Sequence, residues 1–427
     1  MIHIKMKNKI YNLLVPIFFL LIFSSAYSQK LLIPMDLSQT DHLKAYGITY
    51  WHLTNGGTSE WLLNYRGGSF MFDYTDNLAA ECRIRGVFFE RISDGNGASI
   101  LEEVRQEGVN MEAVKLEKAP KIAVYAPPGV QPWDDAVRMA MEYAEVKHDI
   151  IWDEEVMSDK LKDYDWLHLH HEDFTGQYGK FWVSYRNTPW YIQQVALSES
   201  MAKKLGYPDV CQLKKAVAEK IRQYVAAGGF LFAMCTATDS FDIALATANT
   251  DICDAMFDGT PADYNANNKL NYDATFAFEK FKLIMDPTEV EFSDIDVGAQ
   301  NINNPDADWF TLFEFSAKYD PVPTMLTQNH VNVVKGFLGQ TTAYDKQFIK
   351  NTATILAIKD GTSEVRYIHG NVGRGTFTWY GGHDPEDYVH RIGDPPTDLN
   401  LFKNSPGYRL ILNNILFPAA KKKKQKT

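Results

Sequence analysis

The sequence lacks the cysteine patterns of zinc ribbons and of disulfide oxidoreductases. Its 427 residues include only four cysteines, Cys82, Cys211, Cys235 and Cys253, and no two of them form a C-x-x-C pair. This spacing excludes both kinds of site as sequence motifs. It does not fix a pairing, so a disulfide and a set of buried free thiols both stay open.

The sequence also lacks an excess of positive charge. Its formal net charge at pH 7 is −11. An acidic surface disfavours binding to nucleic acid and to anionic membranes, so we expect neither as a partner. The run from Lys421 to Lys424 is the local exception, and we interpret residues 419–427 as a solvated basic tail.

Long apolar runs are scarce. The prominent one, Leu13 to Phe23, follows three lysines and precedes the small residues Ala26 and Ser28. This order is typical of a secretory signal peptide, and the run is too short for a comfortable membrane span. We therefore predict a signal peptide over residues 1–28, cleaved near Ser28. The mature protein is expected to be periplasmic or extracellular, without a membrane span.

Short apolar segments alternate with amphipathic ones along the remaining chain. Residues 29–117 are expected to form a smaller N-terminal α/β unit, and residues 118–418 a larger α/β domain with a mostly parallel sheet. The turn-rich residues 250–310 predict an insertion that caps the site. In parallel sheets ligands lie at the carboxyl ends of strands, where the loops after positions 125, 170 and 234 are expected to converge.

The most informative segment runs from Gly228 to Ser240. An apolar stretch ends at Cys235, which has Ala233 and Ala237 two places to either side. A strand that turns sharply into a helix needs small side chains at the bend, and a helix N-terminus favours a thiolate there. The pattern predicts a nucleophile elbow with Cys235 at its tip. A cysteine that only packs in the core is the alternative interpretation.

A second informative segment ends in Gly381-Gly382-His383. A β-branched and aromatic strand runs into the paired glycines, which permit close approach of two backbones. This predicts that His383 lies in a loop at the edge of the sheet. An antiparallel strand pair is expected before it, at residues 365–369 and 375–380.

These two segments together resemble the class I glutamine amidotransferase-like superfamily. The strand around Gly373-Arg374-Gly375, the His383-Asp384-Pro385-Glu386 turn and the closing helix with Asn413-Asn414-Ile415 are similar to its ThuA-like branch. The resemblance covers roughly residues 120–240 and 365–418. It implies an α/β fold with a flavodoxin-like, mostly parallel sheet.

The resemblance also implies roles for single residues. Cys235 would be the nucleophile, His383 its base and Glu386 the carboxylate that orients the base. Here the histidine and glutamate are three residues apart, whereas the family has them two apart. The neighbouring Thr236 and Asp384 are expected to contact the substrate. The implied activity is glutaminase-like hydrolysis of an amide, with no cofactor.

The mature chain is also similar to exported bacterial proteins often labelled asparagine synthetase B, for example from Pro34 to His42 and from Asn64 to Phe70. The chemistry of that label is not supported. The cleaved chain would begin at Gln29 instead of a cysteine, and it has no Ser-Gly-Gly-x-Asp-Ser loop.

A third cluster, His168 to Asp173, follows a predicted strand. We expect His170, His171 and Glu172 to line the same pocket as His383 and to bind a small-molecule amide or carbohydrate. Three functions remain open: a cysteine-dependent amide hydrolase, a ThuA-like protein that binds a carbohydrate or metabolite without catalysis, and a metal-dependent hydrolase centred on His170, His171 and His383. Bound metal in the purified protein would separate the third from the others.

Overall fold

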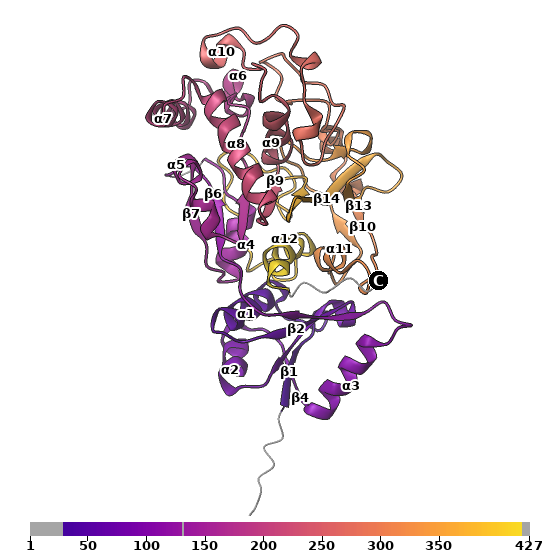
Figure 1. Cartoon of the computed structure of the whole chain (residues 1–427). Coiled ribbons are helices and arrows are strands. Elements are labelled where there is room, and N and C mark those ends of the chain that lie inside the picture. Colours follow the sequence, from indigo (N-terminus) through magenta and orange to yellow (C-terminus); the bar gives the residue numbers. More distant parts are fainter. Residues whose placement is uncertain (1–28, 130–131, 421–427) are drawn as a thin grey trace, which may run out of the picture.

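A computed structural model describes residues 29–129 and 132–420 of the chain (Figure 1). They form two β-sheets. The first has five strands in the order β4-β1-β3-β2-β5, and the second has ten strands. The signal peptide and the basic tail that the sequence predicts lie outside the described residues, except for positions 419 and 420.

The N-terminal sheet is antiparallel throughout. Alternate residues of β1 face opposite sides, as a strand requires: Leu31 and Ile33 belong to the main core, whereas Leu32 packs with Val104 of α3. The elements are β1 (Gln29–Ile33), α1 (His42–Thr54), β2 (Ser59–Leu63), β3 (Ser69–Asp73), α2 (Asp76–Arg85), β4 (Glu90–Ser93), α3 (Asp94–Arg105) and β5 (Glu112–Leu116). The prediction of a smaller N-terminal unit of strands and helices agrees with this arrangement.

The larger sheet has a parallel half and an antiparallel half. Its order is β11-β10-β13-β14-β15-β9-β8-β6-β7, and β12 pairs with β14. The strands from β15 to β7 run parallel, whereas β10 to β14 pair antiparallel. The sheet is therefore more mixed than predicted. The expected strand pair around positions 370–374 is confirmed, because β14 and β15 pair antiparallel there.

The strands of this sheet are β6 (Ile122–Tyr125), β7 (Asp149–Ile151), β8 (Trp166–Leu169), β9 (Phe230–Met234), β10 (Trp309–Leu312), β11 (Val333–Lys335), β12 (Tyr344–Asp345), β13 (Ala353–Ile358), β14 (Glu364–Val372) and β15 (Gly375–Tyr380). The helices are α4 (Ala136–Tyr143), α5 (Asp153–Met157), α6 (Trp182–Tyr185), α7 (Pro189–Lys204), α8 (Val210–Ala226), α9 (Thr236–Ala246), α10 (Ala255–Asp258), α11 (Pro321–Leu326) and α12 (Pro406–Leu416).

The segment predicted as an insertion has little regular structure. Between α10 and β10 the described chain forms short 3-10 turns and isolated bridges. Asp242 of α9 anchors it by accepting the backbone N–H groups of Phe276, Ala277 and Phe278 at 2.7 to 3.0 Å. This anchor holds the insertion against the helix that follows the elbow.

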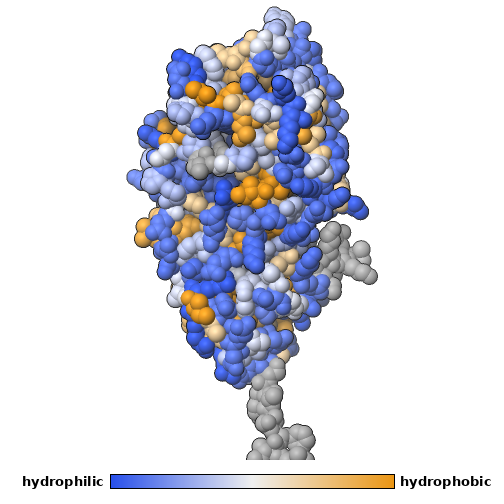
Figure 2. All heavy atoms as spheres, turned by 90° about the vertical axis from the view of Figure 1, so that its left-hand side faces the viewer, coloured by the Kyte–Doolittle hydropathy of each residue, from blue (hydrophilic) through white to orange (hydrophobic). Residues whose placement is uncertain are grey.

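The outer surface is largely hydrophilic on the face that Figure 2 shows, with separate apolar patches. Among the described residues, none of the helices combines the length and apolar character that crossing a membrane would require.

Two histidines, the buried His42 and the half-buried His330, join the two parts of the molecule. His42 of α1 stacks on His330 with ring centroids 4.2 Å apart, and its Nδ1 lies 2.9 Å from Asn404 Oδ1. The Arg409 guanidinium of α12 lies 3.4 Å from His330 Nδ1. Burial and the neighbouring Arg409 lower the pKa of His42 to about 4, and burial, His42 and Arg409 lower the pKa of His330 to about 3.

The low pKa values of His42 and His330 predict that the folded protein loses stability in acid. Below about pH 6.5 the unfolded chain binds protons at these histidines that the folded chain does not, so stability falls as pH falls towards 4. We expect the His330→Asn variant to lose less unfolding free energy between pH 7 and pH 5, by about 1 kcal/mol after allowing for the partial exposure of His330. Urea unfolding at both pH values measures the difference. Equal losses in variant and parent would contradict the prediction.

Candidate functional site

Four parallel strands deliver the predicted site residues to one edge of the sheet. Val124 of β6 is aligned with His168 of β8, Leu169 with Ala233 of β9, and Met234 with Tyr380 of β15. The loops that follow these strands therefore start at the same level. This confirms the expected convergence of the loops after positions 125, 170 and 234, and it adds the loop that carries His383.

Cys235 lies at a sharp bend between β9 and α9. Its backbone has φ 52° and ψ −139°, and it is the N-cap of α9. A positive φ is costly for a residue with a side chain, and it persists only where the surroundings enforce it. The bend that the sequence predicts is present. The Ala237 N–H donates to the carbonyl of His170 at 3.0 Å, which fixes the elbow to the end of β8.

The environment of the Cys235 thiol is enclosed. Burial raises the pKa of the Cys235 thiol, while backbone N–H groups of Thr341 and Gln340 and the Thr236 hydroxyl oppose that rise. The Thr236 hydroxyl oxygen lies 3.7 Å from Sγ. The thiol is therefore held mainly in its protonated form.

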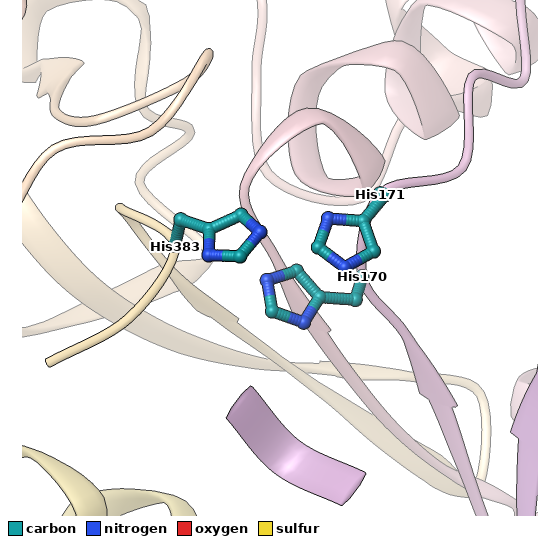
Figure 3. A group of neighbouring side chains, drawn as sticks. All are labelled: His170, His171 and His383. Atoms are coloured by element: carbon teal, nitrogen blue, oxygen red, sulfur yellow. The ribbon is translucent and has the colours of Figure 1, made fainter. Parts of the chain in front are cut away.

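Three histidines converge beside this bend (Figure 3). His170 and His171 follow the last residue of β8, and His383 comes from the loop after β15. One ring nitrogen can be taken from each histidine such that all three atoms lie within 4.8 Å of one another. The ring centroids of His170 and His171 are 3.8 Å apart, and that of His383 is 4.7 Å from the first and 4.5 Å from the second.

Four ring nitrogens of this cluster are buried and have no hydrogen-bond partner among the residues that the structure describes. They are Nε2 of His170, Nε2 of His171 and both ring nitrogens of His383. Burial, with the neighbouring histidines, holds the pKa of His171 and of His383 well below the usual value. The imidazoles of His171 and His383 are therefore neutral, and each has a buried nitrogen without a hydrogen-bond partner. Leaving such polar atoms unpaired is unfavourable unless a ligand binds between the rings.

Asp135 orients one of these histidines from behind. It is the N-cap of α4, and its Oδ1 lies 3.1 Å from His170 Nδ1 and 3.2 Å from His168 Nε2. Burial opposes its ionisation, but His168 and His170 hold the pKa of Asp135 well below the usual value. A carboxylate on Nδ1 directs the Nε2 electron pair of His170 towards His171 and His383. Carboxylate–histidine pairs of this kind support metal ligands.

A second donor set shares His383. Asp134, His383 and His390 also place one ligand atom each within 4.8 Å of the others. His390 stacks on His383 with centroids 4.3 Å apart, and its Nε2 lies 2.8 Å from Asp134 Oδ1. Burial opposes the proton on His390, but Asp134 and Asp387 raise its pKa to about 9. A protonated imidazole is not a metal ligand, so the set of His170, His171 and His383 is the better metal site.

Cys235, Thr236 and His383 line one cavity of about 330 Å³, together with His171 and Val290 of the insertion. The predicted nucleophile, base and substrate contact are thus brought together. Both ring nitrogens of His383 are without hydrogen-bond partners, so the base is not hydrogen-bonded to the thiol. Val290 shows that the insertion reaches the site, as predicted.

Glu386 and Asp384 are placed elsewhere. The Ser405 hydroxyl interacts with the Glu386 carboxylate, which lines a separate surface pocket with residues 400–406. The structure therefore does not bring Glu386 to His383 as its orienting carboxylate. The fully buried Asp384 accepts the Glu386 N–H at 2.9 Å and the Thr397 hydroxyl at 2.7 Å. It shapes the loop that carries His383.

Glu172 lies between two further cavities. One is also lined by Asp135, His170 and His171, and the other by Lys214, whose Nζ is 4.0 Å from Glu172 Oε2. Burial and nearby carboxylates raise the pKa of Glu172 to about 7, although Lys214 opposes the shift. Because His171 and Glu172 are shared walls, the three cavities form neighbouring compartments of about 310 to 380 Å³ around the histidines.

Sequence reasoning missed the supporting residues of the site. It did not single out Asp134, Asp135 or His390 as site residues. Two adjacent carboxylates in the loop after β6 were a usable signal, because that loop starts at the carboxyl end of a parallel strand. His390 carried no comparable local signal.

No family model and no curated protein matches this chain. Among solved structures, cytoplasmic protein STM3548 from Salmonella typhimurium aligns with TM-score 0.33 and 13% identity, over 71% of this chain and 100% of its own. STM1381 from Salmonella typhimurium LT2 aligns with TM-score 0.34 and 12% identity, over 70% and 100%. A β-galactosidase from Bacillus circulans sp. alkalophilus aligns with TM-score 0.25 and 10% identity, over 62% and 29%. Similarities at this level carry no argument about function.

Proposed function

We propose that this protein is a metal-dependent hydrolase with His170, His171 and His383 as the metal ligands. The observation that carries the proposal is the convergence of three buried imidazoles, four of whose ring nitrogens have no hydrogen-bond partner among the described residues. Three histidines that leave a fourth position open are a common catalytic zinc arrangement. A divalent cation there would supply Lewis-acid chemistry, polarising an acyl oxygen and making a water molecule more acidic.

The chain's own residues supply orientation around that centre. Asp135 fixes the tautomer and ring direction of His170 through its Nδ1 contact. Glu172, with a pKa of about 7, lies in the adjoining cavities, where it could accept or donate a proton near neutral pH. The aromatic residues Trp133 and Phe181 form part of the cavity wall on the Cys235 side. The compartments suit a small amide or carbohydrate derivative as substrate.

We also propose that the larger domain is flavodoxin-like and related to the ThuA-like branch. In chain order, its five parallel strands are arranged 2-1-3-4-5, which supports this parentage. The histidines then lie at the β6/β8 switch point, where doubly wound sheets place their ligands. Export, which the N-terminal segment predicts, is part of the same proposal.

Metal titration tests the function directly. Full-length mature protein, stripped with EDTA and dialysed, is titrated with Zn²⁺ by calorimetry, and Co²⁺ is used in parallel for its visible spectrum. We expect one tight site per chain and hydrolysis of a panel of small esters and amides only after metal is restored. Absence of a tight site in folded protein would exclude the metal-dependent function.

A second candidate is a cysteine-dependent amide hydrolase, which the strained backbone of Cys235 favours. Substrate binding would have to bring His383 into contact with the thiol, because the resting site holds a protonated Cys235 and a neutral His383. Glu386 would take no part through a direct contact with the histidine.

The Cys235→Ala variant separates the two candidates. If the metal centre performs the chemistry, the variant keeps most of its metal-dependent activity and its Zn²⁺ affinity. If the thiol is the nucleophile, activity falls by about 10³-fold or more and Zn²⁺ affinity is unchanged. Circular dichroism confirms that the variant is folded.

A further inference from the structure

Two of the four cysteines lie close together, and neither belongs to the proposed metal centre. Cys211 is near the start of α8, and Cys253 lies in the segment after α9. Their sulfur atoms and a carboxylate oxygen of Asp251 lie within 4.8 Å of one another. Both cysteines are buried and are free thiols in the structure.

The surroundings hold this pair in place. The Cys253 thiol donates to the Thr175 carbonyl at 3.3 Å, and the Cys253 N–H donates to Asp251 Oδ1 at 3.0 Å. A Cβ added at Gly176 would lie 2.5 Å from the Cα of Cys211, so the turn at 175–176 packs directly on that residue. Gly176 has φ +81°, a value that suits glycine.

The two thiols differ in access. Cys211 lines a surface pocket of about 440 Å³ with Asp251 and Lys215, whereas Cys253 is fully buried and does not line it. The neighbouring Cys211 and burial raise the pKa of the Cys253 thiol. An outside reagent therefore reaches Cys211 first.

We propose that Cys211 and Cys253 form a disulfide when the protein meets a thiol–disulfide oxidant, and that this bond links α8 to the segment after α9. The Cys211 thiolate attacks a disulfide RSSR, which gives a mixed disulfide and releases one RS⁻. The Cys253 thiolate then attacks Cys211 Sγ and releases the second RS⁻. Two protein thiols are oxidised and RSSR is reduced to two RSH, and the two sulfur atoms that bond start within 4.8 Å of each other.

The proposed disulfide would constrain the segment of chain that contains the Cys235 elbow. Helices α8 and α9 contact each other, and α8 ends just before β9, whose last residue precedes Cys235 (Figure 1). The bond would close a loop that contains β9, the elbow and α9. By constraining the unfolded chain, it is expected to raise the melting temperature by about 5–10 °C.

Peptide mapping tests the proposal. Mature protein is incubated with oxidised glutathione at pH 8, quenched in acid, unfolded, alkylated with N-ethylmaleimide and digested without reductant. We expect a Cys211–Cys253 cross-linked peptide, and the same product in Cys82→Ser as a matched control. In Cys253→Ser, which lacks the second thiol, glutathione should remain attached to Cys211.

Two results would overturn the proposal. One is recovery of both cysteines in alkylated form from oxidised wild-type protein, a measurement that depends on no variant. The other is protection of both thiols that EDTA removes, because that would assign Cys211, Cys253 and Asp251 to a metal ion instead.

Discussion

The His171→Ala variant is expected to lose Zn²⁺ binding by at least 10³-fold, and the metal-dependent hydrolysis with it. His171 supplies one of the three imidazoles that converge here, and the remaining two cannot complete a site of the catalytic zinc type. Loss of a direct ligand should exceed the 10- to 100-fold loss typical of residues that support ligands. Calorimetric titration of the EDTA-stripped variant measures the affinity.

His171 is the informative position because the cysteine-dependent mechanism does not use it. His383 would serve both mechanisms, as a ligand in one and as a base in the other. The control is His148→Ala, since His148 immediately precedes β7 and its Nδ1 lies 3.2 Å from the Val146 carbonyl oxygen. Parent-like Zn²⁺ affinity in His171→Ala would remove this residue from the site and leave the proposed three-histidine centre without support.

Much of the fold follows from the sequence because its signals are local. Apolar runs next to turn residues predicted β6, β8 and β9, and the strand pair β14 and β15 followed from the glycine-rich turn between them. The other antiparallel strands of the large sheet, from β10 to β13, were not predicted. Strands β10 and β13 lie in segments of weak periodicity, and their pairing joins residues far apart in the sequence.

The site was predictable where a strand end determines position. His170, His171 and Cys235 follow strands whose register places their ends together, and the sequence identified all three. Glu386 shows the limit of this reasoning. One additional residue between histidine and glutamate, compared with the family pattern, accompanies a loop in which Asp384 accepts the Glu386 N–H and the Glu386 side chain reaches Ser405. Local spacing alone cannot reveal such a turn.

The Gly381→Ala variant is expected to have the second-largest effect on the site. A Cβ at position 381 would lie 2.1 Å from the carbonyl oxygen of Thr342. That atom is backbone, so the clash cannot be relieved by rotating a side chain. The Gly381 N–H also donates to the backbone carbonyl of Arg366 at 2.8 Å, which ties the start of the loop to β14. The substitution must therefore move the loop that positions His383.

The size of the effect follows from the short distance to the metal ligands. Only one residue separates Gly381 from His383, whose own N–H donates to Leu338 at 3.0 Å. A shift of about 1 Å in a site of this kind costs about 10²-fold, so Zn²⁺ affinity should fall by that order, and overpacking should lower stability by about 1–3 kcal/mol. Zn²⁺ titration and urea unfolding measure the two losses separately.

Gly108→Ala is the matched control, because a Cβ there meets nothing within 4 Å. It should change neither the Zn²⁺ affinity nor the stability appreciably. A Gly381→Ala variant that is destabilised but binds Zn²⁺ as tightly as the parent would show that the loop yields without moving His383. In that case the paired glycines only allow close packing against Thr342 and Phe337. The position of the His383 ring would then be set by contacts on the other side of the loop, chiefly its stacking on His390.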